Sequence, residues 1–343
     1  FQDGAKFISG NKCELGVGAK HNELPNVYEY TLKKMRQLMK QAEQTAEAHP
    51  DWPRVGIPLV LNMWENLPLW RAFFEELQIA IICSGESSHE LYSIGQFTVP
   101  SDTVCYPAKL VHGHMERLTA RDDLKGIFYP CMSYNFDEKR GDQHYNCPVV
   151  AYYPELLNAN VESLQKLPFW FPYLSLADET LFVKKFAPFM KETFGVSQGA
   201  VAAAAHVAYG AYENWKADIQ AYGEEAIAYA RSKGQKLLVL AGRPYHVDRE
   251  VNHSIDKMFT SLGFVVISER VAANLAEKQQ VNVLNQWTYH ARMYQAARYV
   301  CAHENIELVQ LVSFGCGLDA ITTDEVKDIL ERNGKIYTQL KID

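Results

Sequence analysis

Residues 55–83 read VGIPLVLNMWENLPLWRAFFEELQIAIIC, and this stretch decides the fold class. Its first part, Val55 to Leu61, is an apolar run typical of a buried parallel strand, with Pro58 indicating an edge or bulge position. Residues 66–77 carry apolar side chains at helical spacing, and residues 79–83 are a second short apolar run. The order strand, helix, strand predicts a βαβ unit with parallel strands.

The rest of the chain continues this alternation. We expect strands at residues 126–129, 149–153, 237–240, 264–267, 308–313 and 335–339, and helix at 29–48, over most of 178–234, and at 255–262, 281–302 and 324–332. A length of 343 residues favours two cores. The predicted fold class is therefore α/β, with two Rossmann-like, doubly wound parallel-sheet lobes and a helical connecting region. The predicted boundaries are an N-terminal extension and helix at 1–52, the first lobe at 53–175, the connection at 176–234 and the second lobe at 235–343.

Composition and charge exclude some classes of protein. The net charge of −7 argues against a nucleic-acid partner, which needs clustered Lys and Arg. No apolar run reaches the length of a membrane helix, and no leader indicates secretion, so we expect a cytoplasmic protein. The chain begins Phe-Gln-Asp-Gly without Met, which is typical of a piece of a longer protein.

Five of the seven cysteines occupy turns beside Gly, Pro or Asn, where we expect them to be exposed enough to bind a ligand: Cys13, Cys105, Cys131, Cys147 and Cys316. An odd number of cysteines without a secretory leader favours metal or redox chemistry in a reducing or anaerobic cytoplasm. The other two, Cys83 and Cys301, lie on apolar faces and are expected to be core residues. Placement alone leaves each of the five turn cysteines as either a ligand or a bystander.

Three of these cysteines are placed where ligands gather in α/β sheets. Cys131 and Cys316 each follow a predicted strand, and Cys105 precedes Pro107, a good first helical residue. A thiol at a helix N-terminus favours the thiolate and an anionic cluster. Convergence of such loops between two lobes would suit an iron–sulfur cluster or zinc, although no CxxC is present. Cys147 fits less well, because it precedes its predicted strand.

Several polar residues accompany these cysteines. Lys109 could neutralise a cluster or meet an anionic substrate, or simply lie on a solvated helix face with His112 and His114. Glu86 could donate a proton or cap the next helix. Arg243 and His246 follow a strand where anions bind, but a plain polar turn is the favoured interpretation. No P-loop, dinucleotide fingerprint or GxSxG elbow is present, so any ATP dependence must come from another domain or protein.

Five stretches together resemble the iron–sulfur region of the large proteins related to 2-hydroxyacyl-CoA dehydratase activases. They are IPLVLNMWEN at 57–66, PSDTVCYPAK at 100–109, GRPYH at 242–246, NVLNQWTYHAR at 282–292 and SFGCGLDAITTDE at 313–325. The region resembles dehydratase subunits and double-cubane cluster proteins, whose α/β lobes clasp an iron–sulfur centre. In that lineage, ATP hydrolysis on an activator drives an electron to very low potential onto a cluster.

The resemblance implies a metal cluster between the lobes, of [4Fe-4S] or double-cubane type. Carried over by motif, Cys105, Cys131, Cys147 and Cys316 become ligands, with Cys13 a fifth, which is more than one cubane takes. The chain would be an iron–sulfur oxidoreductase or a dehydratase-like protein, with Lys109, Glu86 and His112 as candidate catalytic residues. Its partners would be an ATPase activator domain or protein and a small-molecule substrate, with a homodimer left open and neither nucleic acid nor membrane.

Two other interpretations stay open. The chain could be a non-catalytic, metal-stabilised binding or interaction module, in which the cysteines hold a structural metal and the cleft docks a partner. It could also be a metal-free hydrolase or transferase that uses Cys105 as its nucleophile.

Overall fold

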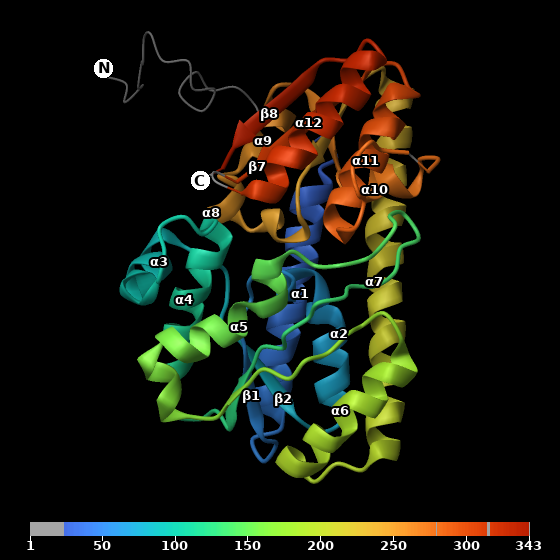
Figure 1. Ribbon diagram of the computed structural model, residues 1–343. Coiled ribbons are helices and arrows are strands. Elements are labelled where there is room, and N and C mark those ends of the chain that lie inside the picture. The colour runs from blue at the N-terminus through green and yellow to red at the C-terminus, as the bar shows by residue number, and fades with distance from the viewer. Residues whose placement is uncertain (1–23, 279, 314–315, 343) are drawn as a thin grey trace, which may run out of the picture.

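The computed structural model describes residues 24–278, 280–313 and 316–342, and it contains two four-stranded parallel sheets. One sheet lies in each half of the molecule, and helices flank both (Figure 1). The strand order is β2-β1-β3-β4 in the first sheet and β6-β5-β7-β8 in the second, so the two lobes share one topology. The α/β class and the two parallel-sheet lobes predicted from the sequence are therefore present.

In the first lobe, the sheet is built from β1 (Arg54–Ile57), β2 (Ala80–Cys83), β3 (Gly126–Phe128) and β4 (Phe169–Trp170). β1 pairs with both β2 and β3, so it is a central strand, and the expected edge position was wrong. Pro58 ends this strand instead, because proline has no N–H to give to a sheet ladder.

In the second lobe, the sheet is built from β5 (Lys236–Ala241), β6 (Phe264–Ser268), β7 (Ile306–Val312) and β8 (Tyr337–Lys341). β5 lies between β6 and β7: after β5 the chain first forms β6 on one side of it and later forms β7 on the other side. The carboxyl ends of β5 and β7 therefore flank a topological switch point, which is where open α/β sheets bind ligands.

The helices are α1 (Val27–Ala48), α2 (Met63–Glu76), α3 (His89–Gly95), α4 (Tyr106–Thr119), α5 (Pro148–Asn160), α6 (Glu179–Phe194), α7 (Gln198–Lys233), α8 (Arg249–Asn252), α9 (Ile255–Ser261), α10 (Glu269–Asn274), α11 (Thr288–Cys301) and α12 (Gly317–Arg332). Short 3-10 turns lie at Gln96–Thr98, Glu162–Lys166 and Pro244–Val247. α1 and α7 run lengthwise past both sheets (Figure 1). These two helices brace the lobes against each other.

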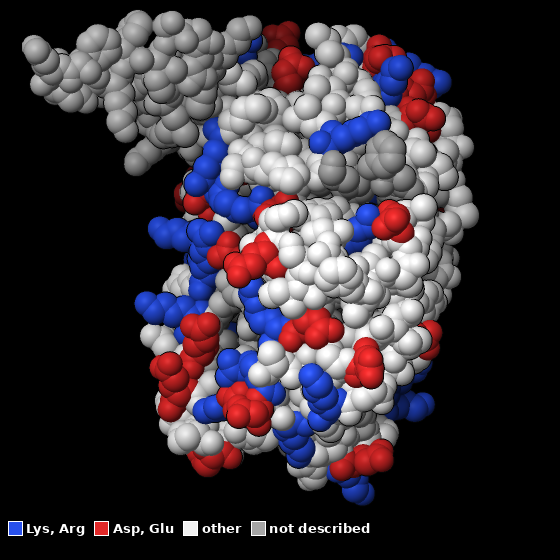
Figure 2. Space-filling model, turned by 90° about the vertical axis from the view of Figure 1, so that its left-hand side faces the viewer, with Lys and Arg blue, Asp and Glu red and all other residues white. Residues whose placement is uncertain are grey.

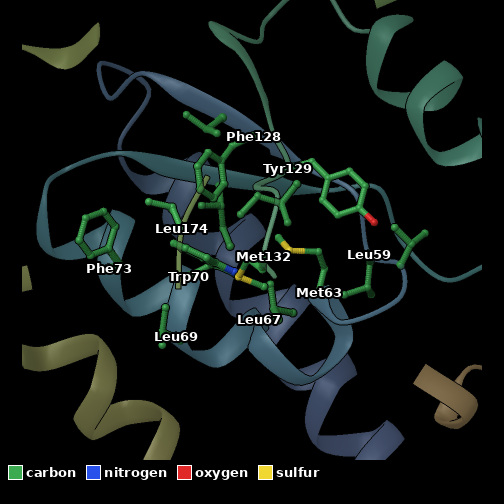
Figure 3. Close-up of a cluster of buried hydrophobic side chains, with 14 of the residues drawn as sticks. Leu59, Met63, Leu67, Leu69, Trp70, Phe73, Phe128, Tyr129, Met132 and Leu174 are labelled. Carbon is green, nitrogen blue, oxygen red and sulfur yellow. The ribbon is translucent and has the colours of Figure 1, made fainter. Parts of the chain in front are cut away.

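Each lobe has its own apolar core. In the first lobe, aromatic rings of α2, β3 and α6 interlock around Trp70, whose ring centroid lies 4.9 Å from that of Phe128. Figure 3 shows part of this cluster, with Trp70, Phe73 and Phe128 beside aliphatic side chains such as Leu67 and Leu174. Buried aromatic rings of this size dominate the energy of a core and fix α2 on the sheet.

Three local predictions were wrong. The expected strand at 149–153 is the first half of α5, because Pro148 opens the helix and its buried residues recur at helical spacing. The expected helix at 281–302 begins only at Thr288, and α10 precedes it. α12 begins at Gly317 rather than at residue 324, which places Cys316 at its N-cap.

No described helix is long and apolar enough to cross a membrane. On the face shown in Figure 2, Lys and Arg side chains are interspersed with Asp and Glu side chains.

Candidate functional site

Three cysteines occupy the same local position, the N-cap of a helix. Cys105 caps α4, Cys147 caps α5 and Cys316 caps α12. Pro107 is the second residue of α4 and Pro148 the first of α5, and the Sγ of Cys147 accepts the N–H of Val150 at 3.4 Å. Because the first N–H groups of a helix lack internal partners and carry partial positive charge, each thiol faces an environment that favours a negatively charged group.

The three thiols come together around Arg243, which follows β5. The Nη2 of Arg243 donates to the Sγ of Cys316 at 3.4 Å. Burial raises the pKa of both other thiols, Cys105 and Cys147; the same guanidinium opposes this rise, and the Cys316 thiol adds to it. Groups influence one another in this way only when they lie close together. The site therefore joins Cys105 and Cys147 of the first lobe to Cys316 and Arg243 of the second.

Burial keeps the thiols of Cys105 and Cys147 neutral in the free protein. Desolvation raises the pKa of Cys105 to about 12, outweighing the N–H of Ala108 and the charge of Arg243. Desolvation also raises the pKa of Cys147, against the same guanidinium and backbone N–H groups. A bound metal cation would reverse this balance, because a coordinating thiol loses its proton.

Arg243 is held in place by Asp319, in the first turn of α12. Its Nη2 and Nη1 lie 2.6 Å and 3.2 Å from the two carboxylate oxygens, and both side chains are less than 5% exposed. Asp319 also accepts the N–H of Ser313 at 2.8 Å. The sequence favoured a plain polar turn at Arg243, and that interpretation was wrong, because the guanidinium is buried against a carboxylate and a thiol.

Buried polar atoms near these groups have no hydrogen-bond partner among the described residues. They include the Nε2 of His246, both ring nitrogens of His290, the Oγ of Ser313 and the hydroxyl of Tyr129. Burial is the main cause that lowers the pKa of both histidines, and Arg243 lowers it further. Burial likewise raises the pKa of Tyr129, and Cys147 and Cys105 add to the rise. These groups therefore lie near Arg243 and the thiols. Unpaired buried polar atoms beside three thiols are what a site that receives a further group requires.

The fourth predicted ligand, Cys131, has different surroundings. It follows β3 and is fully buried, so its expected exposure was wrong. Burial raises its pKa to about 12, and the Glu155 carboxylate adds to this, with no contribution from another described thiol. Burial is the main cause that raises the pKa of Tyr129, two residues earlier, and Cys131, Cys147 and Cys105 add to the rise, whereas Arg243 makes no contribution to the pKa of Cys131 itself.

The remaining cysteines fall outside this site. Cys83 ends β2 and packs against the first core, and Cys301 lies at the end of α11 against the second. Both are only half-buried, although they pack as the sequence predicted. Cys13 lies outside the described residues. Within the described part of the chain, no group of three or more His, Cys, Asp or Glu side chains has the compact arrangement that one metal ion needs.

The three predicted catalytic residues, Lys109, His112 and Glu86, lie in different surroundings. Lys109 lies one turn after Cys105 on α4 and is half-exposed. His112 is buried, with Nδ1 2.7 Å from the Thr98 hydroxyl and Nε2 2.9 Å from the Tyr153 hydroxyl, and burial lowers its pKa to about 4. It is therefore neutral and fully bonded.

Glu86 pairs with Arg36 at 2.6 Å and 2.7 Å on the surface. The helix cap that Glu86 was considered for is supplied by Ser88, whose side chain accepts the N–H of Leu91. Of the three candidates, Lys109 is nearest along the chain to a thiol of the site.

The sequence analysis did not predict a group of buried ion pairs that lies between the two lobes near the site. Arg292 lies 2.8 Å from Glu65 and 2.7 Å from Glu138, and Arg270 also reaches Glu65 at 3.2 Å. Desolvation opposes ionisation of Glu138, but Arg292 together with Arg270 and Arg140 outweighs it and lowers the pKa of Glu138 to about 2. These pairs connect α2 and the loop before α5 to α10 and α11, so they fasten the two lobes together around the thiols.

The sequence pattern of the CoA enzyme activase uncharacterised domain (DUF2229) matches residues 54–271, more than half of the chain. The chain belongs to this family. The match includes Cys105, Cys147 and Arg243 of the site, whereas Cys316 and Asp319 lie beyond it. No curated protein matches the chain. The expected relation to activase proteins is therefore confirmed.

Proposed function

We propose that this chain is an iron–sulfur redox domain that receives low-potential electrons from an ATP-dependent activator and reduces or dehydrates a small substrate between its lobes. Cys105, Cys147 and Cys316 would hold the cluster. The observation that carries this proposal is the meeting of three N-capping thiols, from three helices and two lobes, at the buried guanidinium of Arg243.

The donor set fits a cluster better than a single ion. In a four-iron cluster each thiolate binds a different iron, so the sulfur atoms stand farther apart than around one zinc ion. This agrees with thiols that share one guanidinium without forming a compact single-ion site among the described residues. When bound, the cluster would supply one-electron transfer at low potential.

The surrounding residues have clear supporting roles in this proposal. Three helix N-termini and Arg243 would stabilise the negative charge of a thiolate-bound cluster. Asp319 fixes the guanidinium in its plane through two hydrogen bonds. The Nε2 of His246 and the Nδ1 of His290, which have no hydrogen-bond partner among the described residues, are available to a ligand or substrate inside the site. Lys109, one turn from Cys105, would meet an anionic substrate at the entrance.

Four thiolates complete a cubane, and the proposed set of Cys105, Cys147 and Cys316 numbers three. The fourth position would be taken by Cys131, by Cys13 or by a non-cysteine group such as the substrate itself. A double-cubane cluster would need more thiolates, from Cys131 and Cys13 or from a second copy of the chain. The partners that this function needs are an ATPase activator domain or protein and a small-molecule substrate. The interspersed charges in Figure 2 support the expectation that nucleic acid is not a partner.

The first test is the content of iron, zinc and acid-labile sulfide per chain after anaerobic purification. Near-equal iron and sulfide at about four or more per chain, with absorption near 400 nm, supports the redox function. Zinc without sulfide favours the alternative, a non-catalytic metal-stabilised interaction module. Cysteine labelling that is unaffected by added metal would instead support Cys105 as a nucleophile.

Serine variants then assign the ligands. Cys105→Ser, Cys147→Ser and Cys316→Ser should each lose iron, while Cys83→Ser and Cys301→Ser should retain it, because those two thiols pack in the cores. Equal iron in all five variants rejects the assignment. Cys131→Ser decides the fourth position: loss of iron makes it a ligand despite its separate surroundings, and full retention removes it from the set.

A further inference from the structure

A partly open pocket with a cavity volume of about 40 Å³ lies between the lobes behind Arg243. Its charged and polar lining comes from both lobes and includes Tyr28, Glu65, Arg243, Glu269, Arg270 and Arg292. One water needs about 10–15 Å³ of such space and two to four polar partners, so the cavity suits a few ordered waters. Arg243 lines the cavity and also donates a hydrogen bond to the Cys316 thiol, so the cavity lies directly next to the thiol site.

The two carboxylates of this cavity differ in their pairing. Glu65 lies 2.8 Å from Arg292 and 3.2 Å from Arg270. Glu269, the first residue of α10, is only 3% exposed and makes no ion pair with any described residue. Its partners are backbone N–H groups, including that of Gly242 at the end of β5. Glu269 is thus a buried acid held in position by neutral donors.

The groups that face Glu269 set its protonation. Desolvation raises its pKa to about 7, Glu65 adds to the rise, and Arg292 and the backbone N–H groups oppose it. From α1, the buried Tyr28 hydroxyl is neutral and donates to the carbonyl of Leu240. Arg270 follows Glu269 on α10 but is committed to Glu65, and Arg243 is committed to Asp319. The side chains that line the cavity from α7, Trp215 and Ile219, are not ionisable.

We propose that Glu269 is the proton-exchanging group of the thiol site, taking up a proton through the cavity when the site is reduced and releasing it on oxidation. The inference rests on the proposed function. One electron arrives from a one-electron reductant and one proton arrives from solvent, which converts the Glu269 carboxylate to the neutral carboxyl. Oxidation returns both, so the net charge of the buried site stays constant. Keeping the charge constant avoids the large cost of adding an unpaired charge to a buried site.

The redox test uses the metal-loaded chain in a spectroelectrochemical titration from pH 5.5 to 8.5. The midpoint potential of the native chain should fall as pH rises above about 7, approaching about 59 mV per pH unit, the value for one proton per electron. In Glu269→Gln, which keeps the shape and an oxygen for the Gly242 N–H, the potential should be independent of pH. A slope that persists in Glu269→Gln, or is absent from the native chain, overturns the inference.

Asp248→Asn is the matched control. Asp248 is another buried acid, whose pKa is raised to about 6 by desolvation, but it accepts from Ser87 at 2.6 Å and does not line the cavity. Asparagine also caps a helix well, so α8 should be preserved. This variant should keep the native slope. Loss of the slope in Asp248→Asn would mean that Asp248 exchanges the proton, and it would overturn the proposal for Glu269.

A metal-free readout separates this inference from the proposed function. Infrared spectroscopy of the metal-free chain should show a carboxyl C=O band that titrates near pH 7, is absent in Glu269→Gln and is retained in Asp248→Asn. No such band means that Glu269 does not exchange protons, whatever the metal content. A chain that shows the band but binds neither iron nor sulfide refutes the proposed function and the redox coupling, and leaves Glu269 as a buried acid only.

Discussion

Arg243 and Asp319 form a two-point ion pair that is almost completely shielded from water, with N–O distances of 2.6 Å and 3.2 Å and less than 5% of either side chain exposed. The pair joins the end of β5 to the first turn of α12. It thereby holds a positive charge next to the Cys316 thiol. A charge in this position needs its partner, because water cannot replace it.

Asp319→Asn should therefore lower the free energy of unfolding by about 3–5 kcal/mol, since it leaves Arg243 buried and uncompensated. The asparagine oxygen can still accept the N–H of Ser313, so the loss reports mainly on the charge. Urea unfolding at pH 7 measures it. The control is Asp218→Asn, which breaks the half-exposed pair with Lys34 at 3.0 Å and should cost less than about 1 kcal/mol. Similar losses in the two variants would contradict a buried, unsolvated Arg243.

Gly95→Ala should destabilise the first lobe by more than about 3 kcal/mol. A Cβ at Gly95 would overlap backbone atoms of His112 and Gly113, so α3 and α4 cross too closely for any side chain there. This crossing fixes the helix that Cys105 caps. Chemical denaturation of Gly95→Ala beside Gly210→Ala checks it. Gly210 lies within α7 with open space around it, and alanine there should stabilise the chain by about 0.5–1 kcal/mol. A tolerated Gly95→Ala would mean that the two helices do not meet as described.

The sequence predicted the sheets well because β1, β2 and β5 to β7 are short apolar runs separated by helical patterns. It failed at residues 149–153, where two adjacent valines outweighed the stronger signal of Pro148 after Cys147. That error made Cys147 look misplaced, whereas as the N-cap of α5 it lies within electrostatic reach of Arg243 and Cys316. The position of Cys316 was missed for a similar reason, since the predicted start of α12 was seven residues late.

The charges around the site were not predictable from one sequence. Arg292 and Glu65 are separated by most of the chain, and nothing in either local pattern shows that they meet. A correct start of α12 at Gly317 would have placed Asp319 in the first turn of that helix, next to Cys316, and so would have marked it as a candidate residue of the site. Pairings between lobes depend on how two cores pack, which local periodicity does not encode.

Acid should weaken the fold through His112. Burial lowers its pKa to about 4, whereas the unfolded chain titrates near the ordinary value of about 6.5. Between these values the unfolded state binds more protons, so stability falls as pH falls from about 6.5 to 4. The loss from this residue is on the order of 3 kcal/mol. Urea unfolding at pH 7, 6 and 5 should show a shallower acid loss in His112→Gln than in the native chain. Parallel curves would mean that His112 is charged or solvated in the folded state.

Glu269 should have the opposite effect on stability. Its folded pKa of about 7 lies above the unfolded value of about 4.3, so the folded state binds more protons between these pH values. Stability from this group is therefore fully present below about pH 4.3 and is lost as pH rises through 7. Glutamine stays neutral throughout.

The stability of Glu269→Gln relative to the native chain should therefore rise by on the order of 3 kcal/mol between pH 5 and pH 8. The comparison is made by urea unfolding of both proteins in the same buffers, so that His112 and the other buried histidines contribute equally and cancel. Glu250→Gln, which alters a carboxylate at the start of α8 outside the cavity lining, should show no such change. A difference that stays constant with pH would mean that Glu269 is ionised in the folded protein, and it would leave the cavity without an exchangeable proton.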